Sequence, residues 1–175
     1  IGICNGFQIL VKTGFLPENK GNAQVSTLYT NNCGHFLAKW TKLKINKKST
    51  CIFTKGLPEE IELPIAHGEG KYYADAKTLA NLNKSGAIAL RYTEGPTMKH
   101  FSLPANPNGA LENIAGVTGY DGRVLGLMPH PERAVRFTQL PHWTYLKERY
   151  VRDGVPVPTE GPGIQVFRNA VRYFQ

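Results

Sequence analysis

A cysteine stands between two glycines near the start of the chain, in the stretch Gly2-Ile3-Cys4-Asn5-Gly6. A nucleophile on a sharp turn from strand to helix needs small neighbours two residues before and after it, because its backbone is strained. A helix beginning after Cys4 is expected to lower the pKa of the thiol and to offer backbone N–H groups to an oxyanion. A cysteine can equally be a small buried hydrophobe. The five residues alone leave both interpretations open.

A cysteine nucleophile needs a base, and the base needs a group that orients it. The stretch Pro129-His130-Pro131-Glu132 offers both. The two prolines keep the residues before them out of the helical region, so the backbone is extended and His130 and Glu132 can share one side. The carboxylate could then bind one imidazole nitrogen and leave the other free. The alternative is a surface histidine beside a solvated glutamate.

A second histidine and glutamate lie in the stretch "AHGEG", which spans residues 66–70. Gly68 and Gly70 allow the backbone to approach a ligand closely, although glycines also suit an ordinary turn. We therefore expect His67, Gly68 and Glu69 to line a substrate site and do not assign them a catalytic role.

The elements that would position these residues follow from the apolar pattern. The opening residues predict a strand that turns into a helix ending at Gly14, and a second helix is expected over 76–84. Residues 113–128 predict a hairpin whose second strand leads directly into His130. The stretch "TCIF" (50–53) predicts a short strand.

The end of the chain predicts a helix that closes the domain. Ile164, Phe167, Val171 and Phe174 fall on one helical stripe, which we expect to dock on the core. Residues 138–163 are rich in proline and aromatic residues and predict an irregular surface insertion. Strands that alternate with helices, together with an antiparallel patch, favour an α/β fold: a three-layer sandwich with a mostly parallel sheet and a nucleophile elbow.

Composition narrows the class of protein. The 175 residues are 41% hydrophobic, which suits a single globular domain over residues 1–175. Neither a membrane-spanning segment nor a signal peptide is predicted. The net charge is +8, but the lysines gather in 39–48 on a pattern typical of a solvated strand, so we expect no nucleic-acid partner.

The cysteines indicate the compartment. Three cysteines are an odd number and show no CxxC spacing, so neither a disulfide framework nor a zinc site is predicted. Free thiols fit a reducing compartment. We therefore expect a cytoplasmic protein with no metal site.

Four stretches together resemble one known family: "GICNGFQIL", "PIAHGEG", "NPNGALENIAGV" and "GLMPHPERA". They are similar to the class I, triad-type glutamine amidotransferases, and within that class to the glutaminases of phosphoribosylformylglycinamidine synthase. The elbow and the His-Pro-Glu piece are shared across triad glutaminases, whereas "CNGFQ", "AHGEG" and "MPHPERA" are typical of this member. The resemblance covers most of the chain and is weakest over 138–163.

The resemblance implies a function and a set of roles. Cys4 would form a γ-glutamyl thioester, His130 would act as base and then acid, and Glu132 would orient His130. The backbone N–H of Asn5 would be an oxyanion donor, and Gln8 would help to hold glutamine. The ammonia would pass to a synthase subunit or domain that aminates formylglycinamide ribonucleotide. This domain would need no cofactor, while ATP and magnesium would be bound in the synthase partner.

The resemblance also implies that the domain is N-terminally incomplete. Family members carry early strands and a glycine-rich loop upstream of the nucleophile, and nothing in this sequence matches them. We therefore expect the N-terminal strands, and with them a second oxyanion donor, to be missing before Ile1.

Two other functions stay open from the sequence. One is a different α/β cysteine hydrolase that uses the same elbow, which the glutamate two residues after the histidine disfavours. The other is a basic nucleic-acid-binding module in which Cys4 is only structural.

Overall fold

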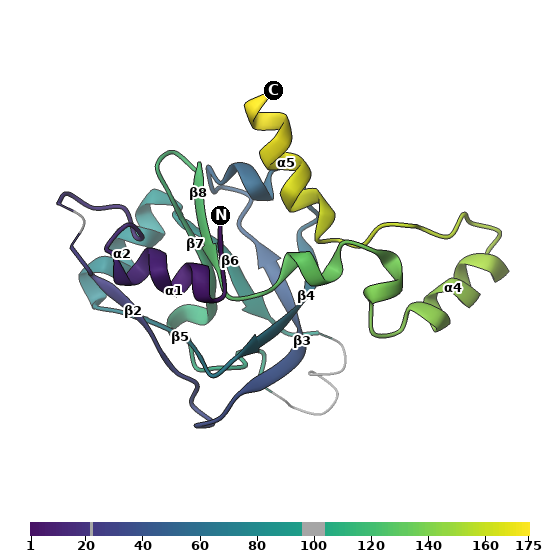
Figure 1. Ribbon diagram of the computed structural model, residues 1–175, viewed down its shortest axis with the longest axis horizontal. Helices are drawn as coiled ribbons and strands as arrows, with labels where there is room; N and C mark the ends of the chain where they lie inside the picture. Colours follow the sequence, from purple (N-terminus) through teal and green to yellow (C-terminus); the bar gives the residue numbers. More distant parts are fainter. Residues whose placement is uncertain (22, 96–103) are drawn as a thin grey trace.

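The computed structural model describes residues 1–21, 23–95 and 104–175, and its centre is a six-stranded sheet (Figure 1). The strands lie in the order β1-β8-β7-β6-β3-β4, and β2 and β5 form a separate two-stranded sheet. The strands are β1 (Gly2–Ile3), β2 (Ser26–Thr30), β3 (Leu37–Ile45), β4 (Glu60–His67), β5 (Glu69–Ala74), β6 (Ile88–Thr93), β7 (Ile114–Gly119) and β8 (Val124–Leu127).

The helices are spread along the chain between and after these strands. They are α1 (Asn5–Lys12), α2 (Ala76–Ser85), α4 (Trp143–Arg152) and α5 (Ile164–Phe174), with short 3₁₀ turns η1 (Ile52–Thr54), η2 (Leu111–Asn113), η3 (Pro131–Ala134) and η4 (Phe137–Gln139). Within the described residues, no helix has the length and apolar character needed to cross a membrane.

The predicted α/β class and the predicted strand-to-helix turn at the start of the chain are confirmed. The expectation of a mostly parallel sheet is wrong for the described strands. Only β1 and β8 pair in parallel there, whereas β8–β7, β7–β6, β6–β3 and β3–β4 are antiparallel. Parallel neighbours need a long crossover connection, and the hairpin turn between β7 and β8 is far too short for one.

Several local predictions can be checked directly. The hairpin of β7 and β8 is confirmed, as is the helix over 76–84, which Gly86 ends at a φ of 70°. Pro64 lies in β4, an outer strand of the sheet, which suits a residue that cannot donate to a ladder. The strand expected at "TCIF" is wrong, because Ile52–Thr54 forms the 3₁₀ turn η1.

The core beside the elbow is formed by one aromatic side chain. Phe7 of α1 is fully buried and stacks on Tyr72 of β5, with ring centroids 6.0 Å apart. A Cβ on Gly126 of β8 would lie 2.0 Å from the Phe7 ring, so only glycine lets β8 pass this close to α1. This contact fixes the helix after the elbow against the strand that leads to His130.

The stripe predicted for the last helix is wrong. Val171 and Phe174 are 56% and 76% exposed, and the buried residues of α5 are Val166 and Asn169. The Asn169 amide donates hydrogen bonds to the carbonyls of Phe53 (2.9 Å) and Lys55 (2.7 Å) in and beside η1. A polar side chain therefore decides which face of α5 docks, and an apolar pattern cannot reveal that.

The segment expected to be irregular over 138–163 contains the helix α4, which has no buried residue. Figure 1 shows this segment as an arm that projects away from the sheet. Its base is fixed by a bridge between Arg136 and Glu160 and by an ion pair between Glu160 and Arg168 of α5.

We predict that Asn169→Ala lowers the free energy of unfolding of the 175-residue chain by about 1 to 3 kcal/mol, because two carbonyls near the core lose their donor. Val171→Ala, on the exposed stripe, is the matched control and should change it by less than about 0.5 kcal/mol. Denaturant titration of both variants measures the difference. If the Val171 variant lost more free energy of unfolding than the Asn169 variant, the apolar stripe would be the face that docks on the core.

Candidate active site

Cys4 occupies a strained turn between β1 and α1. Its φ of 52° and ψ of −105° are unusual for a residue with a side chain. The Cys4 N–H donates to the Leu127 carbonyl of β8 (2.8 Å), and the Cys4 carbonyl accepts from Phe7 (3.0 Å) and Gln8 (3.1 Å) in the first turn of α1. The backbone is thus held from both sides in the conformation that a nucleophile elbow requires.

The two glycines of the elbow are not equally constrained. A Cβ on Gly2 would lie 2.6 Å from the Gly6 carbonyl oxygen and 2.5 Å from the side chain of Leu10. A Cβ on Gly6 would meet nothing within 4 Å. The steric reason for a small residue therefore holds at Gly2, and the structure gives no such reason at Gly6.

His130 and Glu132 form the pair that their spacing predicts. His130 follows β8 with its backbone outside the helical region (φ −107°, ψ 88°), and its N–H donates to the Pro64 carbonyl of β4 (2.8 Å). Its Nδ1 lies 2.5 Å from Glu132 Oε1. The Nε2 atom is buried and has no hydrogen-bond partner among the described residues. With Nδ1 on the carboxylate, Nε2 is the nitrogen free to take a proton.

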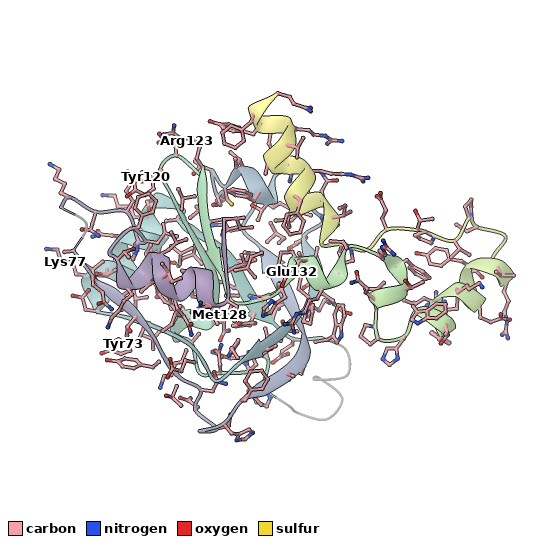
Figure 2. The ribbon with its side chains drawn as sticks, in the orientation of Figure 1. Tyr73, Lys77, Tyr120, Arg123, Met128 and Glu132 are labelled. Carbon is pink, nitrogen blue, oxygen red and sulfur yellow. The ribbon has the colours of Figure 1, made fainter. Side chains whose placement is uncertain are left out.

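The pairing of β1 with β8 brings the cysteine and this pair to the same edge of the sheet. Ile3 lies opposite Leu127 in a parallel register, so both strands end side by side. Figure 2 shows Met128 and Glu132 after the end of β8, far from Tyr120 and Arg123 at the tip of the hairpin. Burial raises the pKa of the Cys4 thiol, and the charge on Glu132 raises it further.

The helix after Cys4 does not make its thiol acidic, which corrects the expectation from the sequence. Burial raises the pKa of Cys4 above its ordinary value, and this effect exceeds the lowering by the Asn5 backbone N–H and by the Arg133 charge. The Cys4 sulfur also lies 3.7 Å from the Ala66 carbonyl. Cys4 is therefore a thiol at neutral pH and needs a base to become a nucleophile.

Three of the predicted substrate residues lie around one cavity. Asn5, Gln8 and Glu69 contribute to a cavity of about 340 Å³ between α1 and β2. The Gln8 side chain donates to the Glu69 carbonyl (2.7 Å), which ties α1 to the start of β5. The Gln8 amide N–H thus has a protein partner, while the Glu69 side chain is exposed.

His67 and Gly68 lie where β4 turns into β5. The Gly68 carbonyl accepts from the Asn31 N–H (2.9 Å). The His67 ring is buried, and its Nδ1 lies 3.0 Å from Asn31 Oδ1. Burial, and to a lesser degree the charge of His130, lowers the pKa of His67 to about 4, so this imidazole is neutral at physiological pH.

Two buried asparagines support this turn, and neither was predicted to do so. Asn31 contacts His67 and Gly70, and the Asn108 amide donates to the Gly70 carbonyl (2.8 Å). Their partners come from segments more than 35 residues away, at separations of 36, 39 and 38 residues. Asn31 lies in no motif, whereas Asn108 lies in the stretch "NPNGALENIAGV", which carries the resemblance without assigning this residue a role.

Metal ligands do not gather in the part of the chain that the structure describes. There, no group of three or more histidine, cysteine, aspartate or glutamate side chains could hold a metal ion.

Comparisons with known proteins agree with this geometry. Residues 1–174 match the family of CobB/CobQ-like glutamine amidotransferase domains. The chain is 44% identical over 175 residues to the phosphoribosylformylglycinamidine synthase subunit PurQ of Dehalococcoides mccartyi. The match covers 99% of this chain and 62% of that relative. It is 41% identical to PurQ of Methanococcus maripaludis strain C7, and this match covers 99% of this chain and 65% of that relative. The chain thus spans less than two thirds of these relatives.

A solved structure gives the same indication. The chain is similar to a chain in the structure of PurLQS from Thermotoga maritima, with a TM-score of 0.65 and 30% identity. The match covers 99% of this chain and 60% of that one. The similarity therefore extends over nearly the whole sequence.

We predict that two neighbours of the Cys4 thiol act on its reactivity with opposite signs. Arg133→Gln removes a charge that lowers the Cys4 pKa, so alkylation by iodoacetamide at neutral pH should slow. Glu132→Gln removes a charge that raises it, so alkylation should become faster. Mass spectrometry of Cys4 against time measures both rates, with the exposed Cys33 as internal control. Equal Cys4 rates in the two variants would contradict this electrostatic account.

Proposed function

This chain belongs to the family of CobB/CobQ-like glutamine amidotransferase domains, and from that membership we propose that it hydrolyses glutamine at Cys4. The ammonia would serve the conversion of formylglycinamide ribonucleotide to formylglycinamidine ribonucleotide. The single observation that carries the proposal is the parallel pairing of β1 with β8, which sets Cys4 beside the segment that holds His130 and Glu132. The relatives named as synthase subunits support the choice of reaction.

The first step forms a thioester. His130 Nε2 takes the proton from the Cys4 thiol while the sulfur attacks the γ-carboxamide carbon of glutamine. Because burial raises the pKa of the thiol, deprotonation and attack are expected to be coupled rather than to start from a stable thiolate. The carbon–sulfur bond forms, and negative charge develops on the amide oxygen.

The backbone N–H of Asn5 is the proposed donor to that oxygen. It precedes the first hydrogen-bonded turn of α1 and already acts on the Cys4 sulfur. An N–H at a helix N-terminus is fixed before the reaction, so it stabilises the developing charge without reorganisation.

Collapse of the tetrahedral intermediate breaks the carbon–nitrogen bond. His130 returns the proton to the departing nitrogen, and ammonia leaves. Water then attacks the thioester with His130 again as base, which gives glutamate and restores the Cys4 thiol. Glu132 accepts a hydrogen bond from Nδ1 throughout and stabilises the imidazolium that forms twice in each cycle.

The proposed glutamine site lies along the start of α1 and the turn between β4 and β5. Glu69 offers an exposed carboxylate that suits the α-ammonium group of glutamine. Asn5 and Gln8 line the same cavity as Glu69. Gly68 would let the backbone approach the substrate, and His67 follows Ala66, whose carbonyl lies 3.7 Å from the Cys4 sulfur.

The proposed partner is a synthase subunit or domain. The similar structure from Thermotoga maritima is titled as a PurLQS complex. The partner would bind ATP, magnesium and the ribonucleotide, while this chain would need no cofactor. We expect the assembly to work in the cytoplasm, without nucleic-acid or membrane partners.

We predict that Cys4→Ala abolishes glutamine-dependent synthesis in the assembled enzyme and leaves synthesis from added ammonium salts unchanged. The variant removes the nucleophile, but the partner's own site would still receive free ammonia. Product formation with each nitrogen source is measured, and Cys33→Ala is the matched control. Loss of both activities would mean that Cys4 is structural, and retention of both would remove the glutaminase proposal.

We predict that His130→Ala lowers glutamine turnover by about 10² to 10⁴-fold, the range typical of general acid–base catalysis. Glu132→Ala should cost less, because the carboxylate acts through His130. Turnover is followed as glutamate release from the assembled enzyme. Full activity in both variants would show that the pair takes no part in the reaction.

A further inference from the structure

Asn31 is a buried side chain whose hydrogen-bonding capacity is completely used. It follows β2 and is 2% exposed. Its Nδ2 donates to the carbonyls of His67 (2.8 Å) and His35 (3.0 Å). Its Oδ1 accepts from the Gly70 N–H (3.1 Å) and lies 3.0 Å from His67 Nδ1. Two carbonyl partners on one side and an N–H partner on the other fix the orientation of the amide.

This orientation determines where the His67 proton is. Asn31 Oδ1 can only accept, so His67 Nδ1 must carry a proton and donate it. In a neutral imidazole the other nitrogen, Nε2, then holds a lone pair. That atom is buried and has no hydrogen-bond partner within the described residues.

The backbone packs tightly around this ring. His67 is 3% exposed. A Cβ on Gly70 would lie 2.2 Å from its Cε1 atom and 2.6 Å from Nε2. The ring therefore cannot turn to reach another partner without displacing the turn that Asn31 and Asn108 hold.

Strand β4, which ends at His67, contacts both Cys4 and His130 of the candidate active site. The Pro64 carbonyl accepts from the His130 N–H at 2.8 Å, and the Ala66 carbonyl lies 3.7 Å from the Cys4 sulfur. His67 is the next residue along β4, where burial lowers its pKa and the charge of His130 lowers it further. The titratable groups around the turn include Cys4, the exposed Glu69 and His35, and the buried Tyr92, whose hydroxyl lies 3.5 Å from the Asn108 amide. Among the described residues, no carboxylate is a hydrogen-bond partner of the His67 ring.

We propose that Asn31 is a positioning residue that acts through His67: it keeps a neutral imidazole, with its proton on Nδ1, beside the His130 and Glu132 pair. This role rests on the glutaminase function proposed above. It adds Asn31 and His67 to the site, two residues that the chemistry of the triad does not itself require.

The consequence is that the site holds a single imidazolium during the reaction. When His130 takes the Cys4 proton it becomes positive, and a second imidazolium nearby would oppose that charge. A neutral His67 avoids this repulsion.

The tautomer can be tested in the full wild-type chain with ¹⁵N-labelled histidine, assigned with His67→Gln. NMR should show a protonated Nδ1 and an unprotonated Nε2 for His67, with shifts constant between about pH 5.5 and 8, the range in which an ordinary histidine titrates. A His67 that titrates within this range, or that carries its proton on Nε2, would overturn the proposal.

The role can be tested with Asn31→Asp and Asn31→Ser in the assembled enzyme. Both variants lose the two amide donors, but only aspartate places a negative charge at Nδ1, which favours a charged His67. In the aspartate variant, glutamine turnover relative to wild type should fall at least about tenfold more at pH 6 than at pH 8, because His67 charges in this interval. The serine variant should be weakened by a similar factor at every pH.

Identical pH profiles for the two variants would overturn the positioning role. Absence of glutamine hydrolysis in the wild-type assembly would overturn the proposed function, and the role of Asn31 in it. If neither variant folds, the wild-type NMR measurement still decides whether the tautomer is the proposed one.

Discussion

The parallel pairing of β1 with β8 is the contact on which the rest of the site depends. β1 has two residues, Gly2–Ile3, yet it carries the nucleophile at its end. The hydrogen bond from the Cys4 N–H to the Leu127 carbonyl (2.8 Å) sets the height of the cysteine against the strand that leads to His130. Two segments more than 120 residues apart thereby meet within one register. Glycine at position 126 is part of the same arrangement, because it lets Phe7 pack directly on β8.

Burial of the nucleophile explains why the base must be so well fixed. An exposed cysteine at a helix N-terminus could be a thiolate without help, but Cys4 is partly buried and its pKa is raised. The thiol therefore needs a base to accept its proton when it attacks the substrate. Two hydrogen bonds hold that base, one to the carboxylate of Glu132 and one to the Pro64 carbonyl. The prolines on either side of His130 also restrict its backbone. Reactivity in such a site comes from the placement of His130, and the helix supplies the oxyanion donor.

Short-range chemistry in this chain could be predicted from the sequence, whereas long-range contacts could not. The elbow at Cys4 and the pair of His130 and Glu132 depend on residues within a few positions of one another, and glycine or proline marks each. The direction of the sheet depends on which strands meet, and the docking face of α5 depends on carbonyls beside η1, so both predictions were wrong. Asn31 has no motif, because its partners lie 36 and 39 residues further along the chain.

The two buried histidines show how one side-chain type receives two electrostatic roles from its partners. His130 has a carboxylate at Nδ1, which favours the positive charge the reaction creates there. His67 has an amide oxygen at the same atom, which accepts a hydrogen bond but carries no charge, and burial lowers the pKa of His67 to about 4. Each ring is thus held through Nδ1 with Nε2 lacking a partner in the described chain. Glutamate as partner gives a base that can become an acid, and asparagine gives an imidazole that stays neutral beside it.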